Sequence, residues 1–220
     1  MPLNHELPRE MGRRILRWWY GSRRDYPWRR EGDPYKILIA EIMLQRTKAE
    51  QVVPVYVEFI SRYPTVQDLA EAKLEDVEEY FARLGLRWRA KKVLAMARYV
   101  TEKFRGRLPE TEEDLLKIPA VGEYIADALS VFAYGRNRVA VDANVVRIVE
   151  RLFCVKSRGE GRRDPRIRQL ANSMLIPGEA REFNWALIDF GALVCKPTNP
   201  LCEKCPLSDL CCYKRRATNP

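Results

Sequence analysis

Four cysteines near the C-terminus could bind a metal together, because they follow one another at the intervals C-x6-C-x2-C-x5-C. They are Cys195, Cys202, Cys205 and Cys211. In a chain expected to stay inside the cell, four thiols so close together favour metal binding over disulfides. A tetrahedral zinc site and an iron–sulfur cluster both use four cysteine ligands. Zinc ribbons usually combine two C-x-x-C pairs and this stretch has one, so the residues alone predict a metal centre of either kind.

Two carboxylates lie where their surroundings should give them different pKa values. Glu41 is in the middle of the apolar run YKILIAEIM, where burial would raise its pKa. Asp142 precedes the helical pattern ANVVRIVERLF, whose N-terminal dipole favours the ionised form. One protonated acid and one ionised carboxylate form the pair that cleaves bonds to a sugar's anomeric carbon. The plainer interpretations are a hydrogen-bonded core carboxylate for Glu41 and a helix N-cap for Asp142.

A short turn, Pro119-Ala-Val-Gly122, separates two expected helices at 111–117 and 123–134. Pro119 ends the first helix, because proline lacks the backbone donor that a helix interior needs. The N–H groups of the turn and of the next helix end would point to one place, where they could bind a phosphate. Taken alone, such a sequence is usually no more than a turn.

Helical periodicity recurs along the whole chain, and no segment shows a convincing strand alternation, so we expect an all-α protein. The segment around Glu41 is apolar on every side, which is typical of a helix at the centre of a helical domain. The expected helices span residues 9–20, 35–47, 49–62, 67–83, 89–104, 111–117, 123–134, 143–153, 166–175 and 179–193.

The composition narrows the class of partner. Over 220 residues the formal net charge is +9, which suggests a polyanion. No apolar run reaches membrane-spanning length and the N-terminus shows no signal-peptide pattern, so we expect an intracellular protein of the cytoplasm or nucleoid with no membrane partner. The single histidine, His5, lies in the N-terminal tail, which argues against histidine triads and histidine metal sites.

The order of these features resembles the helix-hairpin-helix DNA glycosylases of the endonuclease III family. Asp142 follows Gly122 by twenty residues, and the cysteine spacing matches the family's 4Fe–4S loop at every interval. The resemblance covers nearly the whole chain. It implies two interleaved helical domains with a DNA cleft between them. Residues 28–134 would form a helical barrel with the hairpin, and residues 1–27 with 135–220 would form the Fe–S cluster domain.

The resemblance also implies which residues contact double-stranded DNA carrying a mismatched base, with the protein acting as a monomer. Gln45 and Arg46 would fill the place of a base flipped out of the stack. Leu86 or Trp88 would wedge the opposite strand, although core packing is the plainer role for Trp88. Further contacts are expected from Pro119, Val121, Gly122 and Lys196.

Tyr124 decides the expected chemistry. In strand-cutting members of the family, a lysine stands two residues after the second hairpin glycine and attacks the sugar. Tyrosine cannot form that Schiff base, so we expect hydrolysis without strand cleavage, with Tyr124 shaping the pocket. A tyrosine there is similar to the glycosylases that remove thymine or uracil opposite guanine. The alternatives are an adenine-DNA glycosylase acting opposite guanine or oxidised guanine, suggested by Met43-Leu44-Gln45 and Gly191-Ala192, and a non-catalytic Fe–S DNA-binding module.

Ala120, Ile125 and Cys212 depart from the family pattern, and Ile125 stands where the family usually has threonine. Ala120 replaces a hairpin glycine and would cost roughly 1–2 kcal/mol if that position is left-handed. Cys212, next to Cys211, could compete with it as a ligand. Cys154, at an apolar helix end, is expected to be a buried core thiol.

Overall fold

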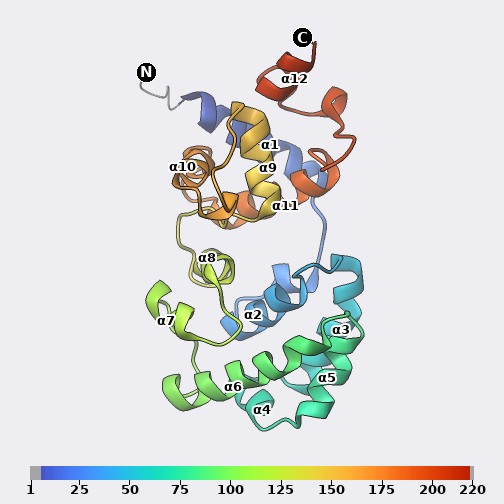
Figure 1. Cartoon of the computed structure of the whole chain (residues 1–220), viewed down its shortest axis with the longest axis vertical. Helices are drawn as coiled ribbons and strands as arrows, with labels where there is room; N and C mark the ends of the chain where they lie inside the picture. Colours follow the sequence, from blue (N-terminus) through green and yellow to red (C-terminus); the bar gives the residue numbers. More distant parts are fainter. Residues whose placement is uncertain (1–5, 219–220) are drawn as a thin grey trace. The chain divides into compact units, whose positions relative to one another are not determined.

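The computed structural model describes residues 6–218, and over that range the secondary structure is helical without strands (Figure 1). The expected all-α fold is confirmed. His5 lies outside the described residues. The chain divides into two compact units, one made of Asp25–Tyr134 and the other of residues up to Arg24 together with those from Gly135 on. Among the described residues, no helix is both long enough and apolar enough to span a membrane.

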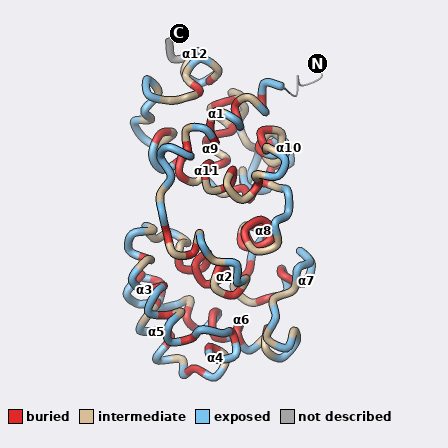
Figure 2. The backbone as a smooth tube through the Cα atoms, turned by 180° about the vertical axis from the view of Figure 1, so that it is seen from behind, coloured by how far each residue is buried: buried red, intermediate tan, exposed pale blue. Residues whose placement is uncertain are grey.

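The unit Asp25–Tyr134 has the apolar helix around Glu41 at its core. That helix packs against the one that follows the hairpin, and Figure 2 shows both of them largely buried. The helices of this unit are α2 (Pro34–Met43), α3 (Ala49–Arg62), α4 (Val66–Ala70), α5 (Leu74–Ala82), α6 (Ala90–Phe104), α7 (Glu112–Lys117) and α8 (Glu123–Phe132), with 3-10 turns η1 (Pro27–Arg29) and η2 (Arg87–Arg89).

The single helix expected over 67–83 is wrong. The structure has two short helices there, α4 and α5, separated by a turn at 71–73. The first begins with a capping box, in which the Thr65 side chain and the Asp68 side chain each bond to the other's backbone N–H. Both helices pack against α6, and the break allows each of them to approach it separately.

The second unit joins the beginning of the chain to its end. Its helices are α1 (Glu6–Ser22), α9 (Ala143–Phe153), α10 (Pro165–Ser173), α11 (Ala180–Leu193) and α12 (Cys212–Thr218), with 3-10 turns η3 (Gly161–Arg163) and η4 (Cys202–Lys204). α1 packs against α11 around the fully buried Asp189. The Asp189 carboxylate accepts hydrogen bonds from Trp19 Nε1 and Arg24 Nε, each at 2.8 Å. A buried carboxylate with two such donors fixes how the N-terminal helix seats on the unit.

Candidate active site and cluster loop

Asp142 is the N-cap of α9, as its position before the helix predicts. Its Oδ1 accepts a hydrogen bond from the Val145 N–H at 2.8 Å, and its Oδ2 accepts one from Asn144 Nδ2 at 2.7 Å. Burial raises the pKa of the Asp142 carboxyl above its usual value, while these hydrogen bonds and the Arg147 charge act in the opposite direction. The helix end is therefore not the only influence on this carboxylate, because desolvation works against it.

A chain of hydrogen bonds connects Asp142 to the first cysteine of the C-terminal loop. Asn144, which donates to Asp142, accepts from Arg147 Nη2 at 2.8 Å. The same guanidinium donates to the Cys195 carbonyl at 2.9 Å and to the Gly191 carbonyl at 2.9 Å. Asn144 is therefore fixed in the orientation that points its amide N–H at the carboxylate, since its oxygen is already occupied.

Gly191 makes this network possible. A Cβ built at Gly191 would lie 2.7 Å from the Asn144 Cβ, closer than side chains approach. α11 can therefore lie against the first turns of α9 only because this residue has no side chain.

The hairpin has the expected form between α7 and α8. Val121 N–H closes the turn on the Ile118 carbonyl at 3.1 Å, and Gly122 is the N-cap of α8. Ala120 has φ +69°, in the left-handed region. The alanine thus carries the backbone strain that the sequence suggested, on the order of 1–2 kcal/mol. Pro119 is half-buried, Val121 is buried and Gly122 is exposed.

Glu41 and Tyr124 both belong to the unit Asp25–Tyr134. Glu41 is 7% exposed within α2, as its apolar surroundings predict. Tyr124 is half-buried in the first turn of α8, two residues after Gly122. α2 and α8 pack together, so this pair of helices carries both side chains. Asp142 belongs to the other unit.

The residues expected to enter a DNA stack lie after α2 and at η2. Arg89 Nη1 donates to Gln45 Oε1, which joins these two segments. Arg46 is exposed with φ +64°. Trp88 is 61% exposed, with the Arg89 guanidinium 4.6 Å from its ring centroid, so core packing is not its role. Leu86 is 5% exposed, which leaves Trp88 as the more accessible of the two wedge candidates.

The four cysteines of the C-terminal loop are free thiols. Burial and, to a smaller extent, the charges of the other three cysteines together raise the pKa of the Cys205 thiol to about 11. The Cys205 sulfur accepts the Leu207 N–H, and the Cys195 sulfur accepts Arg151 Nη1, both at 3.4 Å. A cationic iron–sulfur centre would offset the repulsion between the four thiolates, and the two N–H donors already point at the sulfurs. The cysteine set therefore fits such a centre.

Two cysteine expectations are wrong. Cys154 is a half-exposed disulfide partner of Cys212 rather than a buried core thiol. Cys212 is consequently not a free competitor of Cys211. The physical reason is that α9 ends at Cys154 beside the start of α12, which brings the two Cα atoms to 5.6 Å, a normal disulfide separation. Both thiols are thereby kept out of the ligand set.

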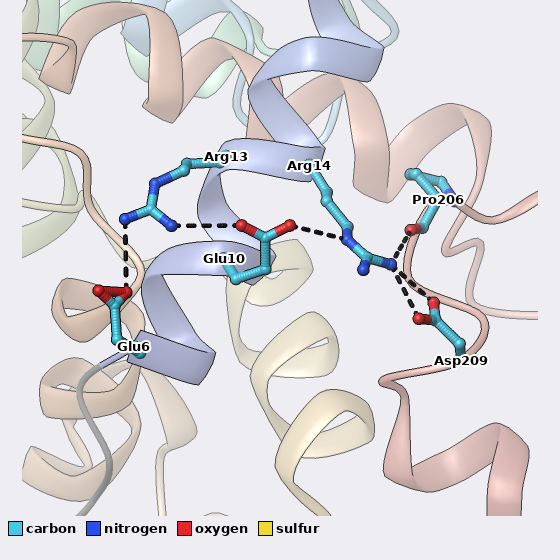
Figure 3. Close-up of polar contacts among 6 residues, drawn as sticks. All are labelled: Glu6, Glu10, Arg13, Arg14, Pro206 and Asp209. Carbon is cyan, nitrogen blue, oxygen red and sulfur yellow. Dashed lines mark hydrogen bonds and ion pairs between the residues drawn. The ribbon is translucent and has the colours of Figure 1, made fainter.

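The N-terminal helix also holds the cysteine loop (Figure 3). Arg14 Nη1 donates to both oxygens of Asp209, at 2.8 and 2.9 Å, and to the Pro206 carbonyl at 3.5 Å. On the other side of Arg14, Glu10 accepts from its Nε at 3.1 Å and also pairs with Arg13. Because Pro206 and Asp209 lie between the third and fourth cysteines, this ion-pair chain anchors that segment to α1. Lys196 is half-buried, and its carbonyl accepts from Arg151 Nη1 at 2.6 Å.

Sequence reasoning missed Asn144, Arg147 and Arg151. A signal was present, because Asn144, Arg147 and Arg151 are spaced at three and four residues and therefore lie along one face of the helix that follows Asp142. Their partners are backbone carbonyls of a distant loop, which no spacing rule identifies. The sequence also contained a sign of the Cys154–Cys212 pair. Four of the six cysteines are the expected ligands, and the two that remain can bond to each other.

This combination of a helical hairpin, a capped aspartate and a four-cysteine loop defines a DNA glycosylase of the helix-hairpin-helix kind. The chain belongs to the HhH-GPD superfamily of base excision DNA repair proteins, whose family model matches residues 39–173. The iron–sulfur binding domain of endonuclease III matches residues 195–211, so the four cysteines are those of an iron–sulfur domain.

Several relatives cover most of the chain. It is 38% identical to a thymine-DNA glycosylase of Aeropyrum pernix over 91% of this chain and 92% of that protein. It is 36% identical to a thymine/uracil-DNA glycosylase of Methanothermobacter thermautotrophicus over 93% of each. A human adenine DNA glycosylase is 35% identical over 92% of this chain and 39% of the longer relative. The solved structure of a thermostable thymine-DNA glycosylase aligns with a TM-score of 0.88 and 34% identity, covering 96% of this chain and 98% of that one.

Proposed function

We propose that this protein hydrolyses the bond between the sugar and a thymine or uracil that is mispaired with guanine in double-stranded DNA. The observation that carries the proposal is Tyr124, half-buried in the first turn of α8 at the place where a lyase lysine would stand. It offers no amine for strand cleavage. The relatives named as thymine and thymine/uracil glycosylases, which match over more than nine-tenths of the chain, support the same substrate class.

A wobble mispair is a physically sensible substrate. To reach the sugar–base bond the enzyme must turn the nucleotide out of the stack, and a mispaired base costs less to extrude than a paired one. Part of the selectivity would therefore come from the DNA. Gln45 and Arg46 are the proposed residues for occupying the vacated stack, and Trp88 is the proposed wedge in the opposite strand. The hairpin N–H groups are the proposed phosphate contacts.

Asp142 is the proposed stabiliser of the cationic sugar that forms as the base leaves. Both of its carboxylate oxygens already accept hydrogen bonds, so its orientation is set before substrate arrives. Preorganised charge of this kind acts most strongly where water is excluded. Glu41, which is 7% exposed in the apolar helix α2, is the proposed acid that assists the leaving base.

A 4Fe–4S cluster is the proposed occupant of the cysteine loop. When bound, it would link the four thiolates and fix the shape of the loop. The chain's own residues would hold that loop in register with the active-site aspartate, through the bonds from Arg147 and Arg151. A purified protein that is colourless and contains zinc in place of iron and sulfide would refute this assignment.

Substrate choice is tested with duplexes carrying T·G, U·G, A·G and A opposite oxidised guanine, each incubated with protein and then cut with alkali. The proposal expects cleavage at T and U. Preferential cutting at A would favour the second candidate, an adenine-DNA glycosylase. That candidate is supported by Met43-Leu44-Gln45, by Gly191-Ala192 and by the adenine relative of similar identity.

Two substitutions test the chemistry. Asp142→Asn keeps the cap on Val145 but removes the charge, so base release should fall by about a hundredfold or more. Near-normal release would reduce Asp142 to a helix cap and move the catalytic role to Glu41. Tyr124→Lys should place an amine at the lyase position, and borohydride should then trap a covalent DNA complex. Trapping with the natural protein would contradict the hydrolytic mechanism.

A further inference from the structure

The Cys154–Cys212 disulfide lies at the edge of the cysteine loop without belonging to its ligand set. Cys154 is the C-cap of α9 and Cys212 is the first residue of α12, so the bond ties the last helix of the chain to α9 across 58 residues of sequence. Cys212 directly follows Cys211, which is the fourth cysteine of the iron–sulfur domain. The covalent link is therefore one residue from a ligand.

The last turns of α9 hold both ends of the same loop. Arg151 donates to the Lys196 carbonyl at 2.6 Å and to the Pro197 carbonyl at 2.9 Å, beside the first cysteine. The Arg151 carbonyl lies 3.6 Å from the Cys211 sulfur, and its guanidinium lies 5.1 Å from the Tyr213 ring centroid. The disulfide is thus the covalent member of a group of contacts that closes the loop on α9.

α12 depends on these contacts. It is seven residues long, which is too short for a helix to be stable by itself in water. Its Tyr213 side chain is 42% exposed, so little apolar burial holds it in place. Apart from the disulfide and the Arg151–Tyr213 contact, an ion pair of Lys214 with Glu203 at 3.0 Å ties it to the loop. Without the disulfide, α12 itself would be held by such weak surface contacts, while the buried Leu207 and the Arg14–Asp209 pair hold the segment before Cys211.

We propose that Cys154 and Cys212 form a reversible redox site that controls how firmly the C-terminal loop keeps its iron–sulfur cluster. Both cysteines are half-exposed, so a small dithiol can reach the bond. A thiolate of the dithiol attacks one sulfur and forms a mixed disulfide, and its second thiolate then displaces the protein sulfur. Two electrons and two protons convert the bond into two thiols, and the dithiol becomes a cyclic disulfide.

Reduction acts on the loop in two ways. It frees the chain after Cys211, and it releases the Cys212 thiol as a neighbour that can replace Cys211 as a ligand. Oxidation prevents both, because a cysteine in a disulfide offers no thiolate to a metal. The oxidised pair therefore keeps the ligand set unambiguous.

The inference rests on the proposed 4Fe–4S cluster but not on the proposed substrate, because the test measures cluster release in the full-length protein carrying its cluster, without DNA. Iron release to an excess of a ferrous chelator is followed under anaerobic conditions by the decay of the cluster's visible absorbance. The proteins compared are the oxidised wild type, the wild type after dithiothreitol treatment and desalting, and Cys154→Ser, Cys212→Ser and the double variant. Alkylation and peptide mass mapping report the state of Cys154 and Cys212 in each sample.

We expect the double variant to release iron about 10–100-fold faster than the oxidised wild type, because removing the support around metal ligands weakens metal affinity by about that factor. Dithiothreitol should bring the wild type at least to this rate, because the reduced wild type also has a free Cys212 thiol, and it should leave the double variant unchanged. Cys154→Ser should release iron faster than Cys212→Ser, because only Cys154→Ser leaves a free Cys212 thiol that can replace Cys211. Helix content measured by circular dichroism checks folding, and the dithiothreitol arm needs no variant. Equal release rates for oxidised wild type, reduced wild type and double variant would overturn the proposal, as would full alkylation of both cysteines in the untreated protein.

Discussion

The hydrogen bond from Asn144 to Asp142 should determine the pH below which the rate of base release falls. Asn144→Ala keeps the Cβ that packs beside Gly191 but removes the amide that donates to Asp142 Oδ2 at 2.7 Å. The bond favours the ionised carboxylate, so its loss raises the pKa of Asp142 further above its usual value, in the same direction as burial. Base release that requires the carboxylate should then need a higher pH.

The size of the shift follows from the strength of such bonds. A hydrogen bond to a charged group contributes roughly 1.5–3 kcal/mol, and one pKa unit corresponds to about 1.4 kcal/mol. In a plot of the single-turnover rate against pH, the rise on the acid side (the acid limb) should therefore shift to higher pH by about 1–2 units. Well above the limb, where Asp142 is ionised in both proteins, the two rates should converge.

The assay is single-turnover base release from a T·G duplex across the pH range, with Asn172→Ala as the matched control. Asn172 Oδ1 accepts the Val139 N–H at 2.9 Å, so this substitution removes an amide of equal size from the same unit without touching Asp142. The control should leave the limb in place. A folded Asn144→Ala whose limb has not moved would refute the assignment of Asp142 as the titrating group, and a uniform loss at every pH would indicate a structural role for Asn144.

Four other changes test the fold and the DNA surface. Asp164→Asn should lower the Tm at pH 7, because Arg166 and a backbone N–H hold the pKa of the Asp164 carboxyl well below its usual value. That stabilisation is complete above the ordinary pKa near 4 and is lost as the pH falls towards the folded-state pKa, so Tm curves of the two proteins should converge in acid. Ala120→Gly should relieve the left-handed strain and stabilise the protein in urea by about 1 kcal/mol or less, after the added chain entropy of glycine. Phe59→Ala should cost about 3–5 kcal/mol in the same assay, since this ring is fully buried. Trp88→Ala should weaken duplex binding in a fluorescence titration while leaving the Tm unchanged, because the side chain is largely exposed.

Local signals were sufficient where the sequence alone determines a helix. The expected helices at 49–62 and 143–153 coincide with α3 and α9, because apolar periodicity continues to both ends and, in α9, Asp142 caps the start. The burial of Glu41 followed from its apolar neighbours in the same way. The left-handed φ of Ala120 agrees with the resemblance, in which a glycine stands at this place, and local sequence signals alone did not predict it.

The remaining features depend on contacts between distant segments. The break between α4 and α5 reflects packing on α6, which local propensity does not record. The direction of the Asn144 amide depends on Arg147, which is itself placed by the carbonyls of Gly191 and Cys195 more than forty residues away. The Cys154–Cys212 bond likewise requires knowing where α9 and the last helix end.

The packing of α1 against α11 has a consequence for how the chain folds while it is being synthesised. Trp19 and its partner Asp189 are 170 residues apart, so α1 cannot dock until most of the chain has left the ribosome. At a translation rate of roughly 5–20 residues per second, the apolar face of Met11, Ile15 and Trp19 stays exposed for about 10–35 seconds before α11 can pack against it. The unit Asp25–Tyr134 is continuous in sequence and can fold during that interval. The N-terminal helix is therefore the natural target for a ribosome-bound chaperone, and ribosome-stalled chains that end before Asp189 should bind one through α1.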